Sequence, residues 1–236
     1  MMSHELRTPL QAVLGYADLL LHGHDGELSA LQLEDIGAIH RGATRMVSII
    51  EQMLDLSRME SGRLDMKSEV VDLAAGPGSR RQGYRSAGRC CKGLEIHLET
   101  PPELPEVLGD PERVQQILLY IVDNAVKFTE CGEVRLTARV QGDWVEATVS
   151  DTGIGIEDEE LAHVFDAFRR RDTRLSRRDG GAGLGLAIAQ RLARQMEGDV
   201  TVSSVLGKGS TFTLRLPTAA SLRRGWQAPS NDAALA

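Results

Sequence analysis

The sequence predicts an α+β fold, in which an antiparallel helical hairpin precedes an α/β sandwich made of a mixed, mostly antiparallel sheet with helices on one face. Three observations support this prediction. Apolar residues recur at the 3.6-residue period of helices through the first 59 residues. Several later segments alternate apolar and polar residues as strands do, and helix signals separate them. The composition, with 42% hydrophobic and 26% charged residues, is that of a globular protein.

Two long helices form the predicted hairpin. Residues 5–21 carry one apolar stripe, and a second stripe follows Ser29, a residue suited to cap a helix, and continues to about Met59. Residues 22–26 break the first helix, and residues 61–62 end the second. One hairpin cannot bury both stripes, so the sequence predicts a homodimer that builds a four-helix bundle.

The predicted sandwich begins near residue 94. We expect strands at residues 94–99, 134–140, 144–149, 200–205 and 211–216, and helices at residues 110–128, 157–164 and 184–196. Asp110 and Pro111 are a typical helix start. Residues 169–182 are rich in Arg and Gly, which predicts a loop.

These patterns divide the chain into four parts. We expect the hairpin at residues 1–67, a linker at 68–93, the sandwich at 94–217 and a disordered tail at 218–236. Residues 76–93 are unusual within the linker, because they contain several arginines and almost no apolar periodicity.

The composition excludes several classes of function. Lys and Arg number 27 against 34 Asp and Glu, and the net charge of −7 argues against nucleic acid or an anionic membrane surface as a partner. Three cysteines without a CxxC pair exclude a zinc ribbon and a disulfide framework. No apolar run reaches the roughly 20 residues that span a bilayer. We therefore expect a cytoplasmic segment without membrane contact, although a longer parent chain is free to carry a membrane anchor.

The first of four clusters with chemical potential lies at the start of the first helix. His4 falls off the apolar stripe, where an imidazole can act as a nucleophile, and Glu5 can orient it and take its proton. An ordinary surface histidine is the alternative interpretation.

The second cluster pairs Asn124 with Lys127, three residues apart on one helix face. An amide oxygen and an ammonium group that converge suit Mg²⁺ together with a phosphate. A solvated polar face is an equally good interpretation.

Glycines mark the other two clusters. Asp151 follows a strand and can accept a hydrogen bond from an amino group, while Gly153 and Gly155 let the backbone approach a planar ligand or simply make a tight turn. Residues 180–185 place glycines before a helix, whose first amides can bind an anion. No strand precedes these glycines, which argues against a Rossmann fold, and no Gly-Lys-Ser/Thr follows, which excludes a P-loop.

In their order and spacing, the four clusters resemble the sensor histidine kinases of two-component systems, over residues 1 to about 217. The resemblance implies a dimerisation and phosphotransfer hairpin followed by an ATP-binding domain of the Bergerat type. It implies that His4 is the phosphoacceptor, that Glu5 is its general base and that Thr8 serves a phosphatase reaction. It also implies that Asn124 binds Mg²⁺. The ATP-binding residues that it implies are Asn124, Lys127, Asp151, Gly153, Gly155, Ile156, Gly181, Gly183, Leu184, Gly185 and Thr211.

The implied activity is autophosphorylation of a histidine with ATP, followed by transfer to an aspartate of a response regulator. Two other classes stay open: another Bergerat-fold ATPase, and a non-catalytic dimeric scaffold.

Several features depart from the family pattern. Tyr120 stands where the family has an asparagine, which alters an oxygen near the metal site, and Ala182 replaces the commoner Thr or Ser. Residues 76–93 lie where the family has an amphipathic helix, and a local change of reading frame would produce such a block. Only three residues precede His4, so the chain resembles a kinase core cut at this histidine.

Overall fold

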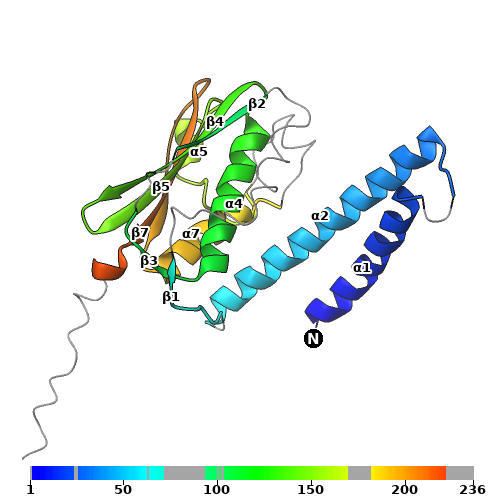
Figure 1. Cartoon of the computed structure of the whole chain (residues 1–236), viewed down its shortest axis with the longest axis horizontal. Helices are drawn as coiled ribbons and strands as arrows, with labels where there is room; N and C mark the ends of the chain where they lie inside the picture. Colours follow the sequence, from blue (N-terminus) through cyan, green and yellow to red (C-terminus); the bar gives the residue numbers. More distant parts are fainter. Residues whose placement is uncertain are drawn as a thin grey trace, which may run out of the picture. The chain divides into compact units, whose positions relative to one another are not determined.

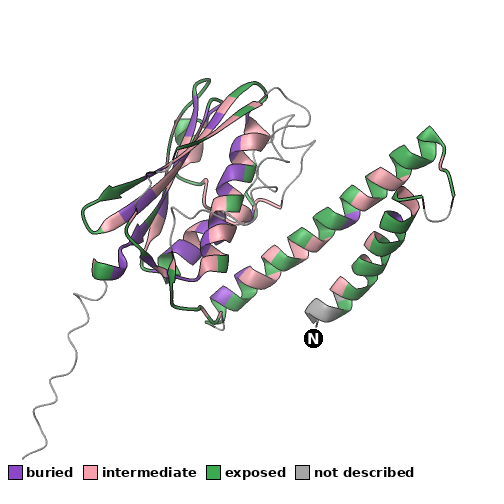
Figure 2. Ribbon diagram, viewed as in Figure 1, coloured by how far each residue is buried: buried purple, intermediate pink, exposed green. Residues whose placement is uncertain are grey.

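Figure 1 shows the computed structural model, which describes residues 2–23, 26–62, 64–71, 94–99, 101, 104–169 and 182–221. The side chains of residues 2–4 and 6 are not described. The chain divides into two compact units, residues 1–64 and 65–236. Figure 2 shows that buried residues are sparse in the first unit and concentrated between the sheet and its helices in the second.

The first unit is the predicted helical hairpin. Helix α1 spans Met2–Leu21 and helix α2 spans Ala30–Glu60. Ser29 starts α2 with a capping box: its hydroxyl accepts from the Gln32 amide at 3.3 Å, and Gln32 Oε1 accepts from the Ser29 amide at 2.9 Å. These reciprocal bonds satisfy two donors that a helix start otherwise leaves unpaired, which explains why α2 begins where the sequence predicts.

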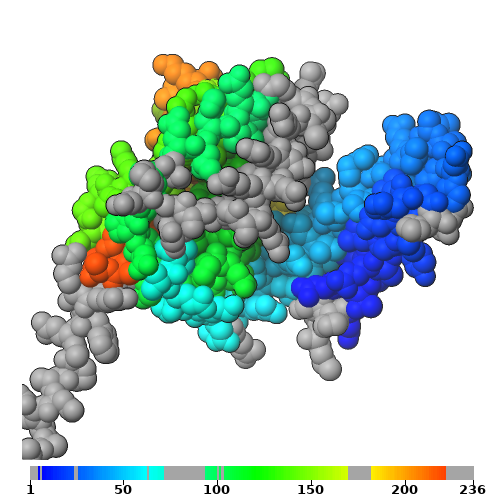
Figure 3. Space-filling model, viewed as in Figure 1, coloured from blue at the N-terminus to red at the C-terminus, as the bar shows by residue number. Residues whose placement is uncertain are grey.

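Two ion pairs report the antiparallel register of the hairpin. Arg7 lies 3.4 Å from Glu51, and His40 Nε2 lies 3.1 Å from the carboxylate of Asp18. The two pairs are eleven residues apart on each helix, which is about three helical turns. The chain runs forward from Arg7 to Asp18 on α1, while their partners run backward from Glu51 to His40 on α2, so the helices are antiparallel. Figure 3 shows α1 packed along α2.

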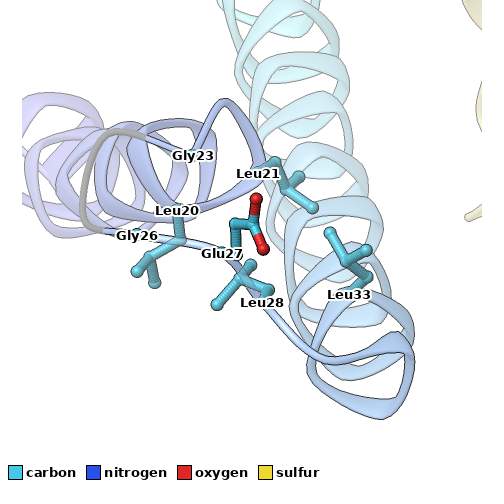
Figure 4. Close-up of a pocket in the computed structure, with 7 residues that line it drawn as sticks. All are labelled: Leu20, Leu21, Gly23, Gly26, Glu27, Leu28 and Leu33. Atoms are coloured by element: carbon cyan, nitrogen blue, oxygen red, sulfur yellow. The ribbon is translucent and has the colours of Figure 1, made fainter.

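The hairpin leaves much apolar surface exposed. Ile39, Met46 and Met53 are exposed and recur every seven residues, so they share one face of α2. Figure 4 shows a further apolar hollow of about 390 Å³ at the turn of the hairpin, where the side chains of four leucines gather with Glu27. The four are Leu20, Leu21, Leu28 and Leu33. Exposed apolar area of this extent is typical of a surface that associates.

The second unit is built on a five-stranded sheet with strand order β2-β4-β5-β7-β6. Its strands are β2 (Leu94–Glu99), β4 (Gly132–Gln141), β5 (Trp144–Asp151), β6 (Asp199–Val205) and β7 (Gly209–Pro217). Strand β2 pairs with β4 in parallel, and the other three pairs are antiparallel. The sheet is therefore mixed and mostly antiparallel, as the sequence predicts.

Helices α4 (Pro111–Phe128) and α7 (Gly185–Gln195) cover one face of this sheet (Figure 1). Asp110 caps α4 through its side chain, as predicted, and the short helix α5 (Asp158–Leu161) follows β5. The core between these layers contains fully buried side chains from both helices: Ile117 and Ile121 of α4, and Ile188 and Leu192 of α7. None of the helices in the described part of the chain has the length and apolar character needed to cross a membrane.

A two-stranded sheet is the feature that the sequence pattern does not predict. Strand β1 (Glu69–Val71), inside the expected linker, pairs with β3 (Val107–Gly109), which lies between the strand expected at residues 94–99 and the helix expected at residues 110–128. Three-residue strands are too short to show alternation, so only their pairing reveals them. Residues 76–93 lie outside the described residues.

At the edge of the large sheet, Leu98 of β2 is 68% exposed.

Ordered structure also continues beyond residue 217, where the sequence predicts a disordered tail. Thr218 is buried and bridges to Val107, and the Ala219 amide donates to the carbonyl of Glu106 at 2.8 Å. These bonds are to residues far away in the sequence, which is why local composition does not reveal them. Residues 222–236 lie outside the described residues.

Helix α7 ends in a Schellman motif with glutamate at the position that favours glycine. The Gly198 amide donates to Ala193 at 2.9 Å and the Glu197 amide donates to Arg194 at 3.1 Å, while Glu197 takes a φ of 60°. A side chain in this left-handed conformation costs roughly 1 kcal/mol.

We therefore predict that Glu197→Gly raises the free energy of unfolding by about 1 kcal/mol and the Tm by about 2–4 °C. Thermal unfolding followed by circular dichroism measures this. Gly198→Ala is the matched control and should lower the Tm, because its Cβ would lie 2.2 Å from the carbonyl oxygen of Arg215. A lower Tm for Glu197→Gly would contradict the prediction.

Candidate functional site

Asp151 ends strand β5 and is only 8% exposed. Its Oδ1 accepts the backbone amides of Gly153 at 2.9 Å and of Ser210 at 3.2 Å. Among the described residues, no group donates a hydrogen bond to Oδ2. The second carboxylate oxygen is therefore able to accept a hydrogen bond from the amino group of a ligand.

The environment of Asp151 disfavours its charge. Burial raises the pKa of the carboxyl, and the backbone amides of Gly153 and Ser210 lower it by a smaller amount. The pKa of Asp151 is higher in the folded state than in the unfolded state. The contribution of its protonated carboxyl to the free energy of unfolding is therefore complete at low pH, and it is lost as the pH rises through the folded-state pKa. The ionised carboxylate is thus disfavoured in the folded state, which is typical of a residue retained for function.

Gly153 and Gly155 lie in a loop that packs directly against other backbone. A Cβ at Gly153 would lie 2.4 Å from the carbonyl oxygen of Phe128, and one at Gly155 would lie 2.2 Å from that of Val205. Gly155 also has a φ of +68°. The space beside these glycines is therefore filled by the protein's own backbone, as in the tight-turn interpretation.

A serine hydroxyl fixes the far end of the same loop. The Ile156 amide donates to Ser204 Oγ at 2.8 Å. Ser204 Oγ also lies 2.8 Å from the carbonyl oxygen of Gly209 and 3.0 Å from Ser210 Oγ. Ile156 thus contributes to the loop through its backbone, and Ser204, which the sequence did not single out, ties the loop to strands β6 and β7.

Asn124 is held in one orientation on α4. Its side-chain nitrogen donates to the backbone carbonyl of Tyr120 at 2.7 Å. Because a carbonyl can only accept, the amide nitrogen must face Tyr120 and Oδ1 must face away. Within the described residues no donor binds Oδ1. Lys127 is half-buried, and its ammonium lies 5.2 Å from the centre of the Phe128 ring.

Gly183, Leu184 and Gly185 lead into helix α7, whereas Gly181 lies outside the described residues. Gly183 has a φ of +70°, and its carbonyl accepts the amide of Phe168 at 3.0 Å. Leu184 is fully buried, so its side chain belongs to the core. Among the described residues, no side chain forms a capping hydrogen bond at the start of α7, where Leu184 holds the N-cap position. Its first amides are thus suited to bind an anion.

Thr211 lies on the opposite face of the sheet from Asp151. Neighbouring residues of a strand alternate between faces, and in β7 the buried Phe212 pairs with Val149 on the helix-covered face. The hydroxyl on the Asp151 side belongs to Ser210, which is buried and whose amide binds Asp151. The sequence contains the signal for this register, because Phe212, Leu214 and Leu216 are the inward, apolar positions of β7.

Helix α4 brings the separate parts of the site together. Its last residue, Phe128, accepts the amide of Ile154 at 3.2 Å in the loop after Asp151. Two turns earlier, the ring of Tyr120 lies against Gly185 at the start of α7, where an added Cβ would be 3.2 Å from the ring. Asn124 lies between these two contacts. The loop after Asp151 and the start of α7 therefore both contact the stretch of α4 that carries Asn124.

His4, Glu5 and Thr8 lie in the first turns of α1, in the other unit. The side chain of His4 is outside the described part of the structure, and Glu5 and Thr8 are exposed. His4 and Thr8 are four residues apart, so they share one face of the helix.

Two family models match the chain, in the order of its two units. The His Kinase A (phospho-acceptor) domain matches residues 1–62. The family described as histidine kinase-, DNA gyrase B-, and HSP90-like ATPase matches residues 109–220.

Curated relatives are similar across both units. The signal transduction histidine-protein kinase BarA of Escherichia coli K12 is 39% identical over 230 residues, which cover 89% of this chain and 23% of BarA. The circadian input-output histidine kinase CikA of Synechococcus elongatus is 38% identical and aligns with 92% of this chain and 29% of CikA. The aerobic respiration control sensor protein ArcB of E. coli K12 is 37% identical and aligns with 91% of this chain and 27% of ArcB. The chain thus spans about a quarter of the length of these relatives.

Solved structures agree with the curated relatives. Full-length ShkA in complex with AMPPNP matches with a TM-score of 0.75 and 36% identity, over 92% of this chain and 45% of ShkA. The Acinetobacter baumannii histidine kinase AdeS shares the fold, with a TM-score of 0.63 and 21% identity over 92% of this chain and 98% of AdeS. A phosphoacceptor hairpin therefore precedes an ATPase domain whose candidate site is organised around Asp151 and Asn124, and the chain belongs to the sensor histidine kinases of two-component systems, as the catalytic core of such a kinase.

Proposed function

We propose that this chain binds Mg²⁺ and ATP, phosphorylates His4 and passes the phosphoryl group to an aspartate of a response-regulator receiver domain. One observation carries the proposal: a hairpin that matches the phospho-acceptor family shares a chain with a site in which the loop after Asp151 and the start of α7 both contact the stretch of α4 that carries Asn124. The histidine kinases among its relatives, and the nucleotide analogue bound to ShkA, support it.

The adenine base would bind at Asp151. Oδ1 is occupied by two backbone amides, so Oδ2 is the acceptor for the exocyclic amino group. The backbone of Gly153, Gly155 and Ile156 shapes the adjoining loop. We assign the nearby hydroxyl contact to Ser210, since Thr211 lies on the other face of the sheet.

The phosphates would bind at the start of α7. The uncapped amides that begin with Gly185 offer donors to an anion, and the backbone of Gly183 and Leu184 leads into them. Gly181 extends this segment in the proposal. Lys127, on the same helix as Asn124, supplies a positive charge for the triphosphate.

Asn124 is the residue that would hold Mg²⁺. Its Oδ1 faces away from the helix backbone, and the described residues contain no group of three or more His, Cys, Asp or Glu suited to a metal ion. One protein oxygen suits Mg²⁺, which usually keeps several waters and takes its other ligands from phosphates. When bound, the ion neutralises charge on the triphosphate.

The proposed chemistry consists of two successive phosphoryl transfers, the first from ATP to His4 and the second from His4 to the aspartate. A ring nitrogen of His4 forms a bond to the γ-phosphorus, the bond from that phosphorus to the bridging oxygen breaks, and ADP leaves. Glu5 takes the proton from the imidazole. In the second transfer, a carboxylate oxygen of the response-regulator aspartate forms a bond to the phosphorus, the bond between that phosphorus and the His4 nitrogen breaks, and the free imidazole is regenerated. Thr8, one turn from His4, would serve the phosphatase reaction.

The hairpin would supply the partners. The exposed stripe of Ile39, Met46 and Met53 at a seven-residue spacing supports a homodimer through a four-helix bundle. The receiver domain is the second proposed partner. Because the reaction consumes ATP, we place it in the cytoplasm.

We predict that the wild-type chain, incubated with Mg²⁺ and γ-labelled ATP, acquires label that survives base and is lost in acid, as expected for phosphohistidine. His4→Gln should acquire no label and bind ATP with unchanged affinity, because the nucleotide site is in the other unit. The control is His22→Gln, an exposed histidine of the same hairpin, which should label like the wild type. Equal labelling of His4→Gln would exclude His4 as the acceptor, and a wild-type chain that binds no nucleotide would favour the dimeric scaffold.

We predict that Asp151→Asn weakens the binding of ATP without lowering the free energy of unfolding. The asparagine keeps one oxygen for the two backbone amides but places an NH₂ group where Oδ2 was, so affinity for ATP should fall at least about tenfold. Removal of the buried charge should leave the free energy of unfolding at neutral pH unchanged or higher. This gain should grow as the pH rises from the ordinary range of an aspartate through the raised folded-state pKa.

Titration calorimetry and urea unfolding at several pH values measure these two effects. Asp158→Asn, at an exposed carboxyl in the first turn of α5, is the control and should change neither. Unchanged ATP affinity in Asp151→Asn would contradict the assignment of the adenine contact.

A further inference from the structure

Tyr120 lies one helical turn before Asn124 and contacts both sides of the proposed site. Its backbone carbonyl accepts the side-chain nitrogen of Asn124 at 2.7 Å. Its ring lies against Gly185, the first residue of α7. The residue therefore lies between the proposed metal ligand and the proposed phosphate-binding amides.

A side chain added at Gly185 would crowd the Tyr120 ring. A Cβ at Gly185 would lie 3.2 Å from Cδ1 of the Tyr120 ring, 3.4 Å from Cγ and 3.7 Å from Cβ. The first of these separations is shorter than ordinary van der Waals contact. The flat ring thus determines how closely the start of α7 approaches α4.

A chain of hydrogen bonds along α4 holds the ring in place. Gln116 Nε2 donates to the Tyr120 hydroxyl at 3.1 Å, and Gln116 Oε1 accepts from Arg113 at 2.8 Å. Gln116 precedes Tyr120 by one turn, so the hydroxyl points toward the N-terminus of α4 and away from Asn124. The phenol oxygen is therefore directed away from the metal ligand, and it is the ring that faces α7.

We propose that Tyr120 is a positioning residue for the triphosphate: its ring sets the separation between Asn124 and the N-terminal amides of α7. The inference rests on the proposed function. In this role Tyr120 touches neither the adenine base nor the acceptor histidine. Its loss should therefore weaken binding of the metal-bound triphosphate and leave binding of the base unchanged. A residue that only fills the core would weaken both equally.

The test compares two ligands, adenosine and ATP with Mg²⁺, by titration calorimetry on the full chain. Tyr120→Ala should bind adenosine within twofold of the wild type and Mg²⁺-ATP about tenfold more weakly, because a small misplacement of paired groups is costly. Tyr120→Phe keeps the ring and should bind Mg²⁺-ATP within about threefold of the wild type. Leu119→Ala, the adjacent and 46% exposed position of α4, is the matched control and should change neither affinity.

A double-mutant cycle with Gly185→Ala tests the contact itself. In the wild-type background the added Cβ presses on the ring, so Gly185→Ala should weaken Mg²⁺-ATP binding. In the Tyr120→Ala background the same change should have little further effect, because the ring is gone. If Tyr120→Ala does not fold, Tyr120→Leu, which keeps an apolar filler without the flat ring, enters the same cycle.

The outcomes separate the inference from the proposed function. Equal losses for adenosine and Mg²⁺-ATP in the Tyr120 variant, or an effect of Gly185→Ala that is the same in both backgrounds, would overturn the positioning role while ATP binding by the wild type stands. A wild-type chain that binds neither ligand would overturn the proposed function and the inference with it.

Discussion

The buried carboxylate of Asp151 is the constraint on which the site depends. Through Oδ1 it binds the amides of Gly153 and Ser210, and so joins the end of β5, the loop that follows and the start of β7. The same region packs backbone on backbone, since a Cβ at Gly209 would overlap the carbonyl of Asp151. The loop is therefore shaped by the protein itself. Oδ2 is in position before any ligand arrives, and preorganisation of this kind lowers the cost of binding.

This arrangement has a cost that the rest of the unit must offset. Burial disfavours the ionised carboxylate, and two amides compensate only in part. The offset comes from the closely packed layer beside it, where Ile117 and Ile121 of α4 and Ile188 of α7 are fully buried. A functional group held at the expense of stability is a common compromise in proteins. Here the buried carboxylate lies at the end of β5, in the same unit as these buried core side chains.

The hairpin follows a different physical logic. Few of its residues are buried, and a stripe that includes Ile39 and Met46 faces solvent. Its local structure is well specified, by the capping box at Ser29 and by the register that Arg7 and Glu51 report. Its packing within one chain is not complete. An element of this kind gains its remaining stability by association.

Residues close together in the sequence determined much of what could be predicted. Helix α2 begins directly after Ser29 and α4 directly after Asp110, because these two cap residues bond to amides two or three residues away. The longer strands can be predicted because apolar and polar residues alternate along them. The short strands β1 and β3 do not, because each exists only through its pairing with the other.

Some residues of the candidate site could likewise be predicted from the sequence, whereas others could be identified only from the tertiary structure. Asp151 and Asn124 stand out in the sequence because residue type and spacing suggest their chemistry. The choice of Ser210 over Thr211 required the register of β7, and the contact between Tyr120 and Gly185 required the packing of α4 on α7. The sequence by itself thus determined the family, the order of the two units and most elements, since these depend on local patterns. Only the tertiary structure decided which side chains meet, because those contacts join residues that the chain keeps far apart.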